Sequence, residues 1–344
     1  MFPKNDPFRR PLQRSIVVPV LLLALISADI GSAQSSARCP QQRFGKFSEW
    51  STPVSLGPVV NSERGDQWPA ISPNGLSLYF ASNRAGGLGS QDIYVTHRVS
   101  PNDAWGEPKS LGPTINSDVR DNSPVLSSDG HWLVFSSARV TGRCSDQTGN
   151  DIFISHRADA EDDFAWEPPV NFGCELSGIG ENAAMTFFED EATGTTTLYM
   201  ASNRPGGVGQ FDLYASTRQF NGTFGTPVLV PELSSPLVDV SQTVRRDGLE
   251  MILVYSATKG PFTDGDLWVS TRDTTSQPWS IPVNLGPVVN TDADDSFPSL
   301  SCDGTELYFA STRAGGLGMD DLYVTTRRKL EDNPILARLR PIQE

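Results

Sequence analysis

The stretch Asp66–Arg98, DQWPAISPNGLSLYFASNRAGGLGSQDIYVTHR, carries a pattern that the chain contains five times. With local departures, each copy has an acid, a proline three residues later, a Ser-x-Asn/Asp-Gly turn, an apolar run, a Ser-x-Arg group, a glycine loop and an Asp-Ile-Tyr segment closed by arginine. The other copies begin at Asp121, Glu181, Asp239 and Asp295. A pattern repeated at this length indicates one structural unit per copy.

Each copy predicts four β-strands separated by turns. Leu78-Tyr79-Phe80 and Ile93-Tyr94-Val95 have the β-branched and aromatic residues that are typical of strands. Asn74-Gly75 accepts positive φ and therefore predicts a hairpin turn after the Asp-x-x-Pro strand. A further strand with an aromatic residue and a proline precedes each acid, and Trp50–Gly57 is the first of these.

Four-stranded units at this period predict an all-β fold, a five-bladed β-propeller with the Asp-x-x-Pro strand innermost in each blade. The strand Trp50–Gly57 precedes every inner strand, and no such strand follows Arg327. We therefore expect this N-terminal strand to complete the fifth blade and close the ring. The propeller is expected over residues 47–328, between an N-terminal segment (34–46) and a C-terminal tail (329–344).

Residues 1–33 predict a cleaved signal peptide. Arg9, Arg10 and Arg14 precede an apolar run over Ile16–Ile26, and small residues end at Ala33. The run is much shorter than the roughly 20 apolar residues that a membrane-spanning helix needs. We expect a periplasmic or secreted protein that is a monomer and has no stable membrane insertion after cleavage. The net charge of −14 disfavours nucleic acid as a partner.

Four cysteines in an exported chain predict two disulfides. Cys302 lies in the turn at the bottom of the fifth blade, and Cys39 precedes the strand that enters this blade from the same side. Cys144 lies in an enlarged glycine loop and Cys174 just after an outer strand, both on the top face. The predicted pairs are Cys39–Cys302 and Cys144–Cys174.

The repeated acids begin the inner strands and should ring the top of the channel. Clustered carboxylates suit Ca²⁺, but a residue repeated in every blade more often maintains the blade. The arginine of Ser-x-Arg can bridge the inner acid and the Asp of Asp-Ile-Tyr. The residues assigned to this structural network are Asp66, Arg84, Asp92, Asp121, Arg139, Asp151, Arg204, Asp212, Asp295, Arg313 and Asp321.

The repeat fails in the third and fourth copies. The fourth has Lys259 where the others have arginine, so Asp239 and Asp266 lose their expected partner, and Asp264 adds another carboxylate. In the third copy Glu181 replaces the usual acid. The hypothesis is that Asp239, Asp264, Asp266 and Glu181 mark a ligand site for a cation, with Ca²⁺ the best suited, or for a basic partner. The alternative is that Lys259 stands in for the arginine.

The pattern Asp-x-x-Pro, Ser-x-Asp-Gly, Ser-Asn-Arg and Asp-Ile-Tyr resembles the WD-like propeller repeats of TolB-type periplasmic proteins over Trp50–Arg327. The resemblance implies a β-propeller that binds a protein or an envelope component through its top face. It implies no catalytic activity, because the residues shared by the family are largely structural.

We therefore expect a non-enzymatic binding platform of the cell envelope. The alternative is a glycosidase-like enzyme that uses inner-strand carboxylates on the top face, since some five-bladed propellers are glycosidases. An enzyme site should break the repeat with unique acids that converge on the channel, whereas most acids here are repeated. This observation favours the binding platform.

Overall fold

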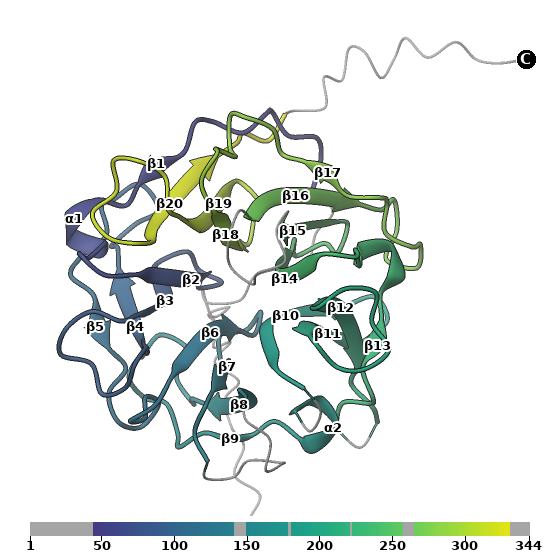
Figure 1. Ribbon diagram of the computed structural model, residues 1–344, viewed down its shortest axis with the longest axis horizontal. Coiled ribbons are helices and arrows are strands. Elements are labelled where there is room, and N and C mark those ends of the chain that lie inside the picture. The colour runs from purple at the N-terminus through teal and green to yellow at the C-terminus, as the bar shows by residue number, and fades with distance from the viewer. Residues whose placement is uncertain (1–43, 141–148, 178–179, 221, 257–264, 331–344) are drawn as a thin grey trace, which may run out of the picture. The chain divides into compact units, whose positions relative to one another are not determined.

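The computed structural model describes residues 44–140, 149–177, 180–220, 222–256 and 265–330. These residues form five antiparallel sheets of four strands each, arranged around a central channel (Figure 1). The inner strands β2, β6, β10, β14 and β18 lie around this channel. The all-β, five-bladed propeller that the repeat predicts is confirmed.

Each blade contains one inner strand, two central strands and a short outer strand. The first blade has β2 (Asp66–Ile71), β3 (Ser77–Ser82), β4 (Asp92–His97) and β5 (Lys109–Ser110). The second has β6 (Asp121–Leu126), β7 (Trp132–Ser137), β8 (Asp151–His156) and β9 (Val170–Asn171). The third has β10 (Asn182–Asp190), β11 (Thr195–Ser202), β12 (Asp212–Thr217) and β13 (Val228–Leu229). The fourth has β14 (Val238–Val244), β15 (Glu250–Ser256), β16 (Gly265–Thr271) and β17 (Val283–Asn284).

The fifth blade contains both ends of the propeller. It is built from β18 (Asp295–Leu300), β19 (Glu306–Ser311), β20 (Asp321–Thr326) and the N-terminal strand β1 (Val54–Ser55). Val54 lies opposite Val324 in the antiparallel pair of β1 and β20. The predicted closure of the ring by the N-terminal strand is therefore confirmed.

The helical segments are single turns: α1 (Gly57–Val60), α2 (Cys174–Ser177) and the 3₁₀ turn η1 (Pro231–Leu233). Each follows the outer strand of one blade and leads toward the inner strand of the next. Within the described ranges, no helix has the length and apolar character needed to cross a membrane.

The blades have apolar central strands, and four of them also contain an arginine–tryptophan stack. Leu78, Tyr79 and Phe80 on β3 are completely buried. The arginine that closes each of four repeats stacks on the tryptophan of the outer segment. The pairs, with the distance from guanidinium carbon to ring centre, are Arg98–Trp105 (4.5 Å), Arg157–Trp166 (4.4 Å), Arg272–Trp279 (4.1 Å) and Arg327–Trp50 (4.2 Å).

A buried ion pair of the second blade is hydrogen-bonded to the first blade. Arg157, which is 1% exposed, donates to Asp163 Oδ1 at 2.5 Å, and Tyr79 of the first blade donates its hydroxyl to the same oxygen at 2.5 Å. Burying charges is unfavourable unless they are paired, so loss of one partner costs more than the pair contributes.

We expect Asp163→Asn to lower the free energy of unfolding by about 3–5 kcal/mol, because it leaves the Arg157 guanidinium buried without a carboxylate. Urea unfolding at pH 7 measures this change. Asp162→Asn, in the same loop but exposed, is the matched control and should stay within about 0.5 kcal/mol of the wild type. Equal effects of the two substitutions would contradict the assignment.

Cys174 and Cys302 lie in the described residues, and neither is a free thiol. Cys39 and Cys144 lie outside those residues, so the pairs Cys39–Cys302 and Cys144–Cys174 stay predictions. Peptide mapping under non-reducing conditions is expected to recover these two linked peptides. Reduction of a native bridge of this kind typically lowers stability by about 2–5 kcal/mol. A Cys39–Cys144 linkage would show that the pairing is wrong.

Candidate functional site

The repeated acids at the starts of the inner strands are used within their own blades. Asp66 is completely buried; Oδ2 accepts from the backbone N–H of Ser62 at 2.6 Å, and Oδ1 accepts from Arg84 at 2.7 Å. Asp121 and Asp295 repeat this arrangement with Arg139 at 2.7 Å and Arg313 at 2.5 Å. In these blades, the carboxylate holds the incoming loop against the strand and leaves little capacity for a ligand.

The arginine was also expected to bridge to the Asp of Asp-Ile-Tyr, but this Asp has other hydrogen-bond donors. Besides Asp66, Arg84 donates to the carbonyl of Val60 and to Ser82, whereas Asp92 accepts from the backbone N–H groups of Leu88 and Gly89. The glycine loop folds tightly onto this acid. A Cβ atom on Gly87 would lie 2.0 Å from Asp92 Oδ2, so the loop needs glycine for close approach.

The same loop arrangement recurs at Asp212 and Asp321. Asp212 accepts from the N–H groups of Val208 and Gly209, and Asp321 accepts from that of Leu317. Asp151 instead accepts from Asn171 at 3.1 Å. The arginine therefore donates to the inner-strand acid, whereas backbone N–H groups or a side-chain amide donate to the Asp of Asp-Ile-Tyr.

The third blade shifts the expected acid by one position. Asn182 pairs with Ser202 across the blade, as Asp66 pairs with Ser82, and Asn182 Oδ1 accepts from Arg204 at 3.0 Å. Asn182 thus occupies the place of the repeated acid. Glu181 precedes it and lies at the mouth of the channel.

The other residues of the hypothesised ligand site have different surroundings. Asp239 is completely buried and accepts from the backbone N–H and the hydroxyl of Ser235. Asp266 accepts from Asn284 at 2.9 Å, and Asp264 lies outside the described residues. In the portion of the chain that the structure describes, no group of three or more His, Cys, Asp or Glu side chains is arranged to hold a metal ion.

The pKa of Asp239 is raised to about 7, mainly by burial and also by the nearby Asp212, while the hydrogen bonds from Ser235 oppose the change. Burial also raises the pKa of Asp266, against the hydrogen bond from Asn284. Asp239 therefore binds a proton in the folded protein at a pH where an ordinary aspartate is ionised.

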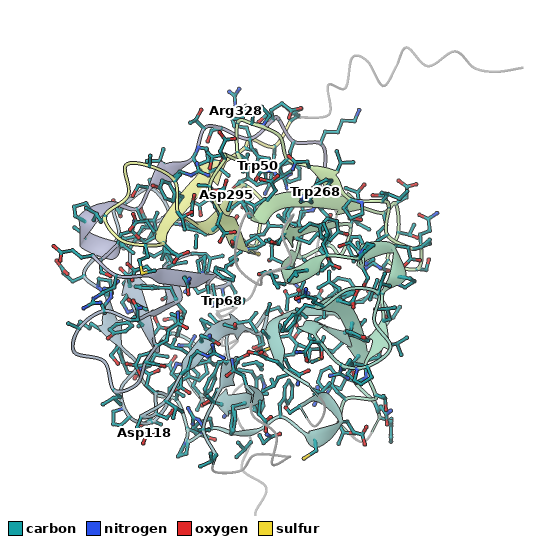
Figure 2. All side chains as sticks on the ribbon, in the orientation of Figure 1. Trp50, Trp68, Asp118, Trp268, Asp295 and Arg328 are labelled. Atoms are coloured by element: carbon teal, nitrogen blue, oxygen red, sulfur yellow. The ribbon has the colours of Figure 1, made fainter. Side chains whose placement is uncertain are left out.

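A hollow lies at the top of the channel, where the inner strands begin. Its cavity volume is about 120 Å³. Its lining residues are Gln67, Trp68, Gln91, Arg120, Asn122, Asn150, Glu181, Ala183 and Phe297. Figure 2 shows Trp68 near the middle of the ring of blades.

The aromatic part of the lining results from a repeated break in the inner strands. Trp68 (φ 55°) and Phe297 (φ 57°) have a left-handed backbone, as do Ser123 and Ala184 at the same position of their blades. The ladder register shifts there, between Gln67 and Ala70 in the first blade. The Trp68 and Phe297 rings lie 3.8 Å apart between centroids and contribute an apolar surface to the hollow.

The polar part of the lining is hydrogen-bonded from blade to blade. Gln67 donates to Asp320 at 2.9 Å, and Gln91 donates to Gln67 at 2.9 Å. Farther round, Arg120 of the second blade donates to Glu181 of the third at 3.2 Å. Polar contacts therefore follow the mouth of the channel from the fifth blade to the third.

Three acids beside this mouth are not part of the repeat: Glu181, Asp294 and Asp320. Asp294 and Glu181 occupy the position just before the inner-strand acid, which is Gly65 in the first blade. Asp320 occupies the position just before Asp-Ile-Tyr, which is Gln91 in the first blade. The sequence reasoning missed Asp294 and Asp320; the signal was that these two positions change from copy to copy while their neighbours do not.

The pKa of Asp320 is raised to about 6, first by burial and then by the nearby Asp294 carboxylate. Asp321 and Asp66 make smaller contributions to the same shift, and the hydrogen bond from Gln67 opposes it. Asp294 itself is 7% exposed and accepts from the backbone N–H of Gly265 at 2.7 Å and from Ser296 at 2.6 Å. The fifth blade thus presents two neighbouring carboxyl groups with different surroundings.

No family model and no curated protein matches this chain. Among solved structures, an α-L-arabinofuranosidase from Podospora anserina is similar at 16% identity and TM-score 0.54, covering 86% of this chain and 99% of that one. An α-L-arabinofuranosidase from Lactobacillus brevis gives 15% identity and TM-score 0.57, covering 81% and 94%. TolB from Agrobacterium tumefaciens gives 15% identity, covering 83% and 100%, but its TM-score of 0.44 supports no conclusion.

These findings correct the expectation of a non-enzymatic binding platform. The two similar structures named above with TM-scores over 0.5 are α-L-arabinofuranosidases, which favours the alternative that the sequence left open. The expectation rested on the acids being repeated, and it did not separate the repeated acids from Glu181, Asp294 and Asp320. At these identities the likeness is one of fold alone, and a fold does not by itself determine an activity.

The raised pKa of Asp239 predicts a pH dependence of stability. The folded protein holds a proton on this group up to about pH 7, whereas an unfolded chain releases it near the ordinary aspartate pKa of 3.8, so stability falls as pH rises between these values. The loss amounts to about 4 kcal/mol at most. Asp239→Asn removes it, and we expect urea unfolding at pH 8 to show a variant about 2–4 kcal/mol more stable than the wild type.

Asp66→Asn is the matched control, since Asp66 holds the same position in the first blade and is paired with Arg84. This substitution should destabilise at pH 8, because it removes a charged partner from a largely buried guanidinium. Equal pH dependence of the wild type and Asp239→Asn between pH 4 and 8 would contradict the prediction.

Proposed function

We propose that the protein is a glycoside hydrolase whose active site is the hollow on the top face. Glycoside hydrolysis requires one carboxylic acid that protonates the leaving oxygen and one carboxylate on the other side of the sugar. The observation that carries the proposal is the placement of the non-repeated acids: Glu181 lines the hollow, and Asp320, which has Asp294 as a neighbour, is hydrogen-bonded to the lining residue Gln67.

Asp320 is the proposed general acid. Its pKa of about 6 keeps a substantial fraction of the carboxyl protonated in weakly acidic to neutral solution, which suits proton donation. Asp294 contributes by its charge, because a neighbouring carboxylate disfavours ionisation of Asp320. In this role Asp294 tunes the acid and does not contact the substrate.

Glu181 is the proposed second carboxylate. It lines the hollow from the third blade, and Arg120 fixes it by an ion pair of 3.2 Å. Asp320 belongs to the fifth blade and is linked to the hollow through the lining residue Gln67, so the two acids lie in non-adjacent blades. In the proposed reaction, a sugar in the hollow meets the Glu181 carboxylate and receives its proton from Asp320.

The size and floor of the hollow favour a single sugar unit. Its volume of about 120 Å³ is well below the roughly 300–1,000 Å³ of sites for drug-sized ligands. The Trp68 and Phe297 rings supply an apolar face on which a sugar ring can pack, and the amides around them supply hydrogen bonds to hydroxyls. The proposed reaction is removal of one terminal or branching sugar, with α-L-arabinofuranosides and β-D-xylosides as the first candidates.

The test is release of 4-nitrophenol from a panel of 4-nitrophenyl glycosides, including α-L-arabinofuranoside and β-D-xyloside, together with sugar release from arabinoxylan. We expect Asp320→Asn to lower kcat/KM about 10²–10⁴-fold, the usual contribution of a general acid. Glu181→Gln should have an effect of similar size.

Asp292→Asn is the matched control, because Asp292 is exposed in the loop that contains Asp294. Its activity should equal that of the wild type. Absence of hydrolysis across the panel by folded wild-type protein, or activity in Asp320→Asn equal to that of Asp292→Asn, would overturn the proposed function.

A further inference from the structure

Three side-chain amides form a row along the mouth of the channel. Gln67 Nε2 donates to Asp320 Oδ2 at 2.9 Å. Gln91 Nε2 donates to Gln67 Oε1 at 2.9 Å, and Asn122 Nδ2 donates to Gln91 Oε1 at 3.0 Å. Every amide in the row therefore directs its N–H group toward Asp320 and its oxygen away from it.

Formation of a blade does not require amide side chains at these positions. The position of Gln67 and Asn122, just after the inner-strand acid, is occupied in the other blades by Ala183, Val240 and Ser296. The position of Gln91 is occupied in the other blades by Asn150, Phe211, Gly265 and Asp320. Since apolar residues serve at both positions, the amides have a role specific to this side of the channel.

The orientation of each amide is fixed by the next one along the row. A side-chain amide carries a donor and an acceptor of similar size, and its neighbours decide which one faces a given partner. Gln91 donates to the oxygen of Gln67, which leaves the Gln67 N–H group for Asp320. Asn122 fixes Gln91 in the same way, and Ser123 Oγ lies 3.5 Å from the Asn122 oxygen at the end of the row.

We propose that Asn122, Gln91 and Gln67 form a positioning relay that holds Asp320 Oδ2 as a hydrogen-bond acceptor, so that the exchangeable proton of this carboxyl is carried on Oδ1. The catalytic meaning of the relay rests on the proposed function, in which Asp320 is the general acid. The placement of the proton rests on the hydrogen bonds alone. Gln67 contacts Asp320 directly, whereas Gln91 and Asn122 act on Asp320 through Gln67.

The groups around Asp320 determine the direction of the effect. Asp294 before β18, Asp321 on β20 and Asp66 on β2 all raise its pKa, whereas the donated hydrogen bond of Gln67 lowers it. Of these, Asp66 is itself paired with Arg84 at 2.7 Å. Loss of the Gln67 donor therefore shifts Asp320 toward its protonated form.

The relay predicts that substitutions far from Asp320 have the same sign of effect. Gln67→Met removes the donor. Gln91→Leu leaves the Gln67 amide able to turn its oxygen toward a protonated Asp320, and Asn122→Ala releases Gln91 in the same way. All three substitutions are expected to raise the pH at which Asp320 titrates, by about one pH unit for Gln67→Met and by less for the other two.

The measurement is ¹³C NMR of the full chain labelled at the aspartate carboxyl carbon, titrated from pH 4 to 9, with the Asp320 signal assigned by its loss in Asp320→Asn. The wild-type midpoint is expected near 6. Asn150→Ala is the matched control. Asn150 occupies the position of Gln91 in the second blade and lines the same hollow, but it accepts from Arg120 and lies outside the row.

An upward shift in Gln91→Leu and Asn122→Ala, with the Asn150→Ala midpoint equal to that of the wild type, supports the relay. Wild-type midpoints in both distal variants would overturn it, since Gln67 would then act alone. A shift in Asn150→Ala equal to that in Gln91→Leu would also overturn it, because any change in the lining would then suffice. Near-UV circular dichroism selects the variants that keep the native fold.

This readout separates the relay from the proposed function, because it requires no turnover. Shifted titrations in a protein that hydrolyses no glycoside would refute the enzyme and retain the relay. In an active protein, the basic limb of the kcat/KM profile should move with the NMR midpoint in Gln91→Leu. A pH profile that stays fixed while the NMR midpoint moves would overturn the assignment of Asp320 as the acid that the relay serves.

Discussion

A buried carboxylate at the start of the inner strand is the constraint on which most blades depend. Asp66, Asp121 and Asp295 are completely buried, and a buried charge is tolerated only when hydrogen-bond donors surround it. The loop N–H groups and the arginine supply those donors, so these residues recur with little freedom to change. The positions immediately before and after this acid do not have to hold a completely buried carboxylate. They vary between blades and are therefore available for a function that only one side of the channel performs.

The contrast between the repeated acids and the variable positions beside them explains what could be predicted from the sequence. Turn residues and apolar strands recur in five copies, and each copy describes local geometry, so the propeller could be predicted from them. The single additional strand at the N-terminus predicted the closure by β1. The site did not follow, because it lies one residue away from the repeat. Glu181 was aligned with the repeated acids, whereas the structure gives that place to Asn182. Since successive strand residues point to opposite sides, an offset of one residue changes which surroundings a side chain meets.

The third and fourth blades both lack the ion pair between the inner-strand acid and the arginine of Ser-x-Arg that the other three blades have. In the third, a neutral Asn182 faces Arg204, and burial lowers the pKa of that arginine. In the fourth, Asp239 is buried with hydroxyl and backbone donors from Ser235, and its pKa is raised to about 7. Glu181 of the third blade also pairs with Arg120 of the second. The sequence shows that these two blades depart from the repeat, but only the contacts distinguish a buried acid that binds a proton from an acid that lines the hollow.

The charges around the hollow are consistent with the chemistry proposed for it. Glu181 and Arg120 form an ion pair and together add no net charge. Asp294 lies close enough to Asp320 to raise the pKa of Asp320, so below about pH 6 most of the Asp320 carboxyl is protonated. The Glu181 carboxylate lines this apolar-floored hollow. In the proposed reaction, a carboxylate there has little effect on a neutral sugar but attracts the positive charge of an oxocarbenium-like transition state. An interaction that strengthens only as charge develops lowers the barrier without tightening substrate binding, and this makes an acidic hollow of this kind better suited to catalysis than to holding a neutral ligand.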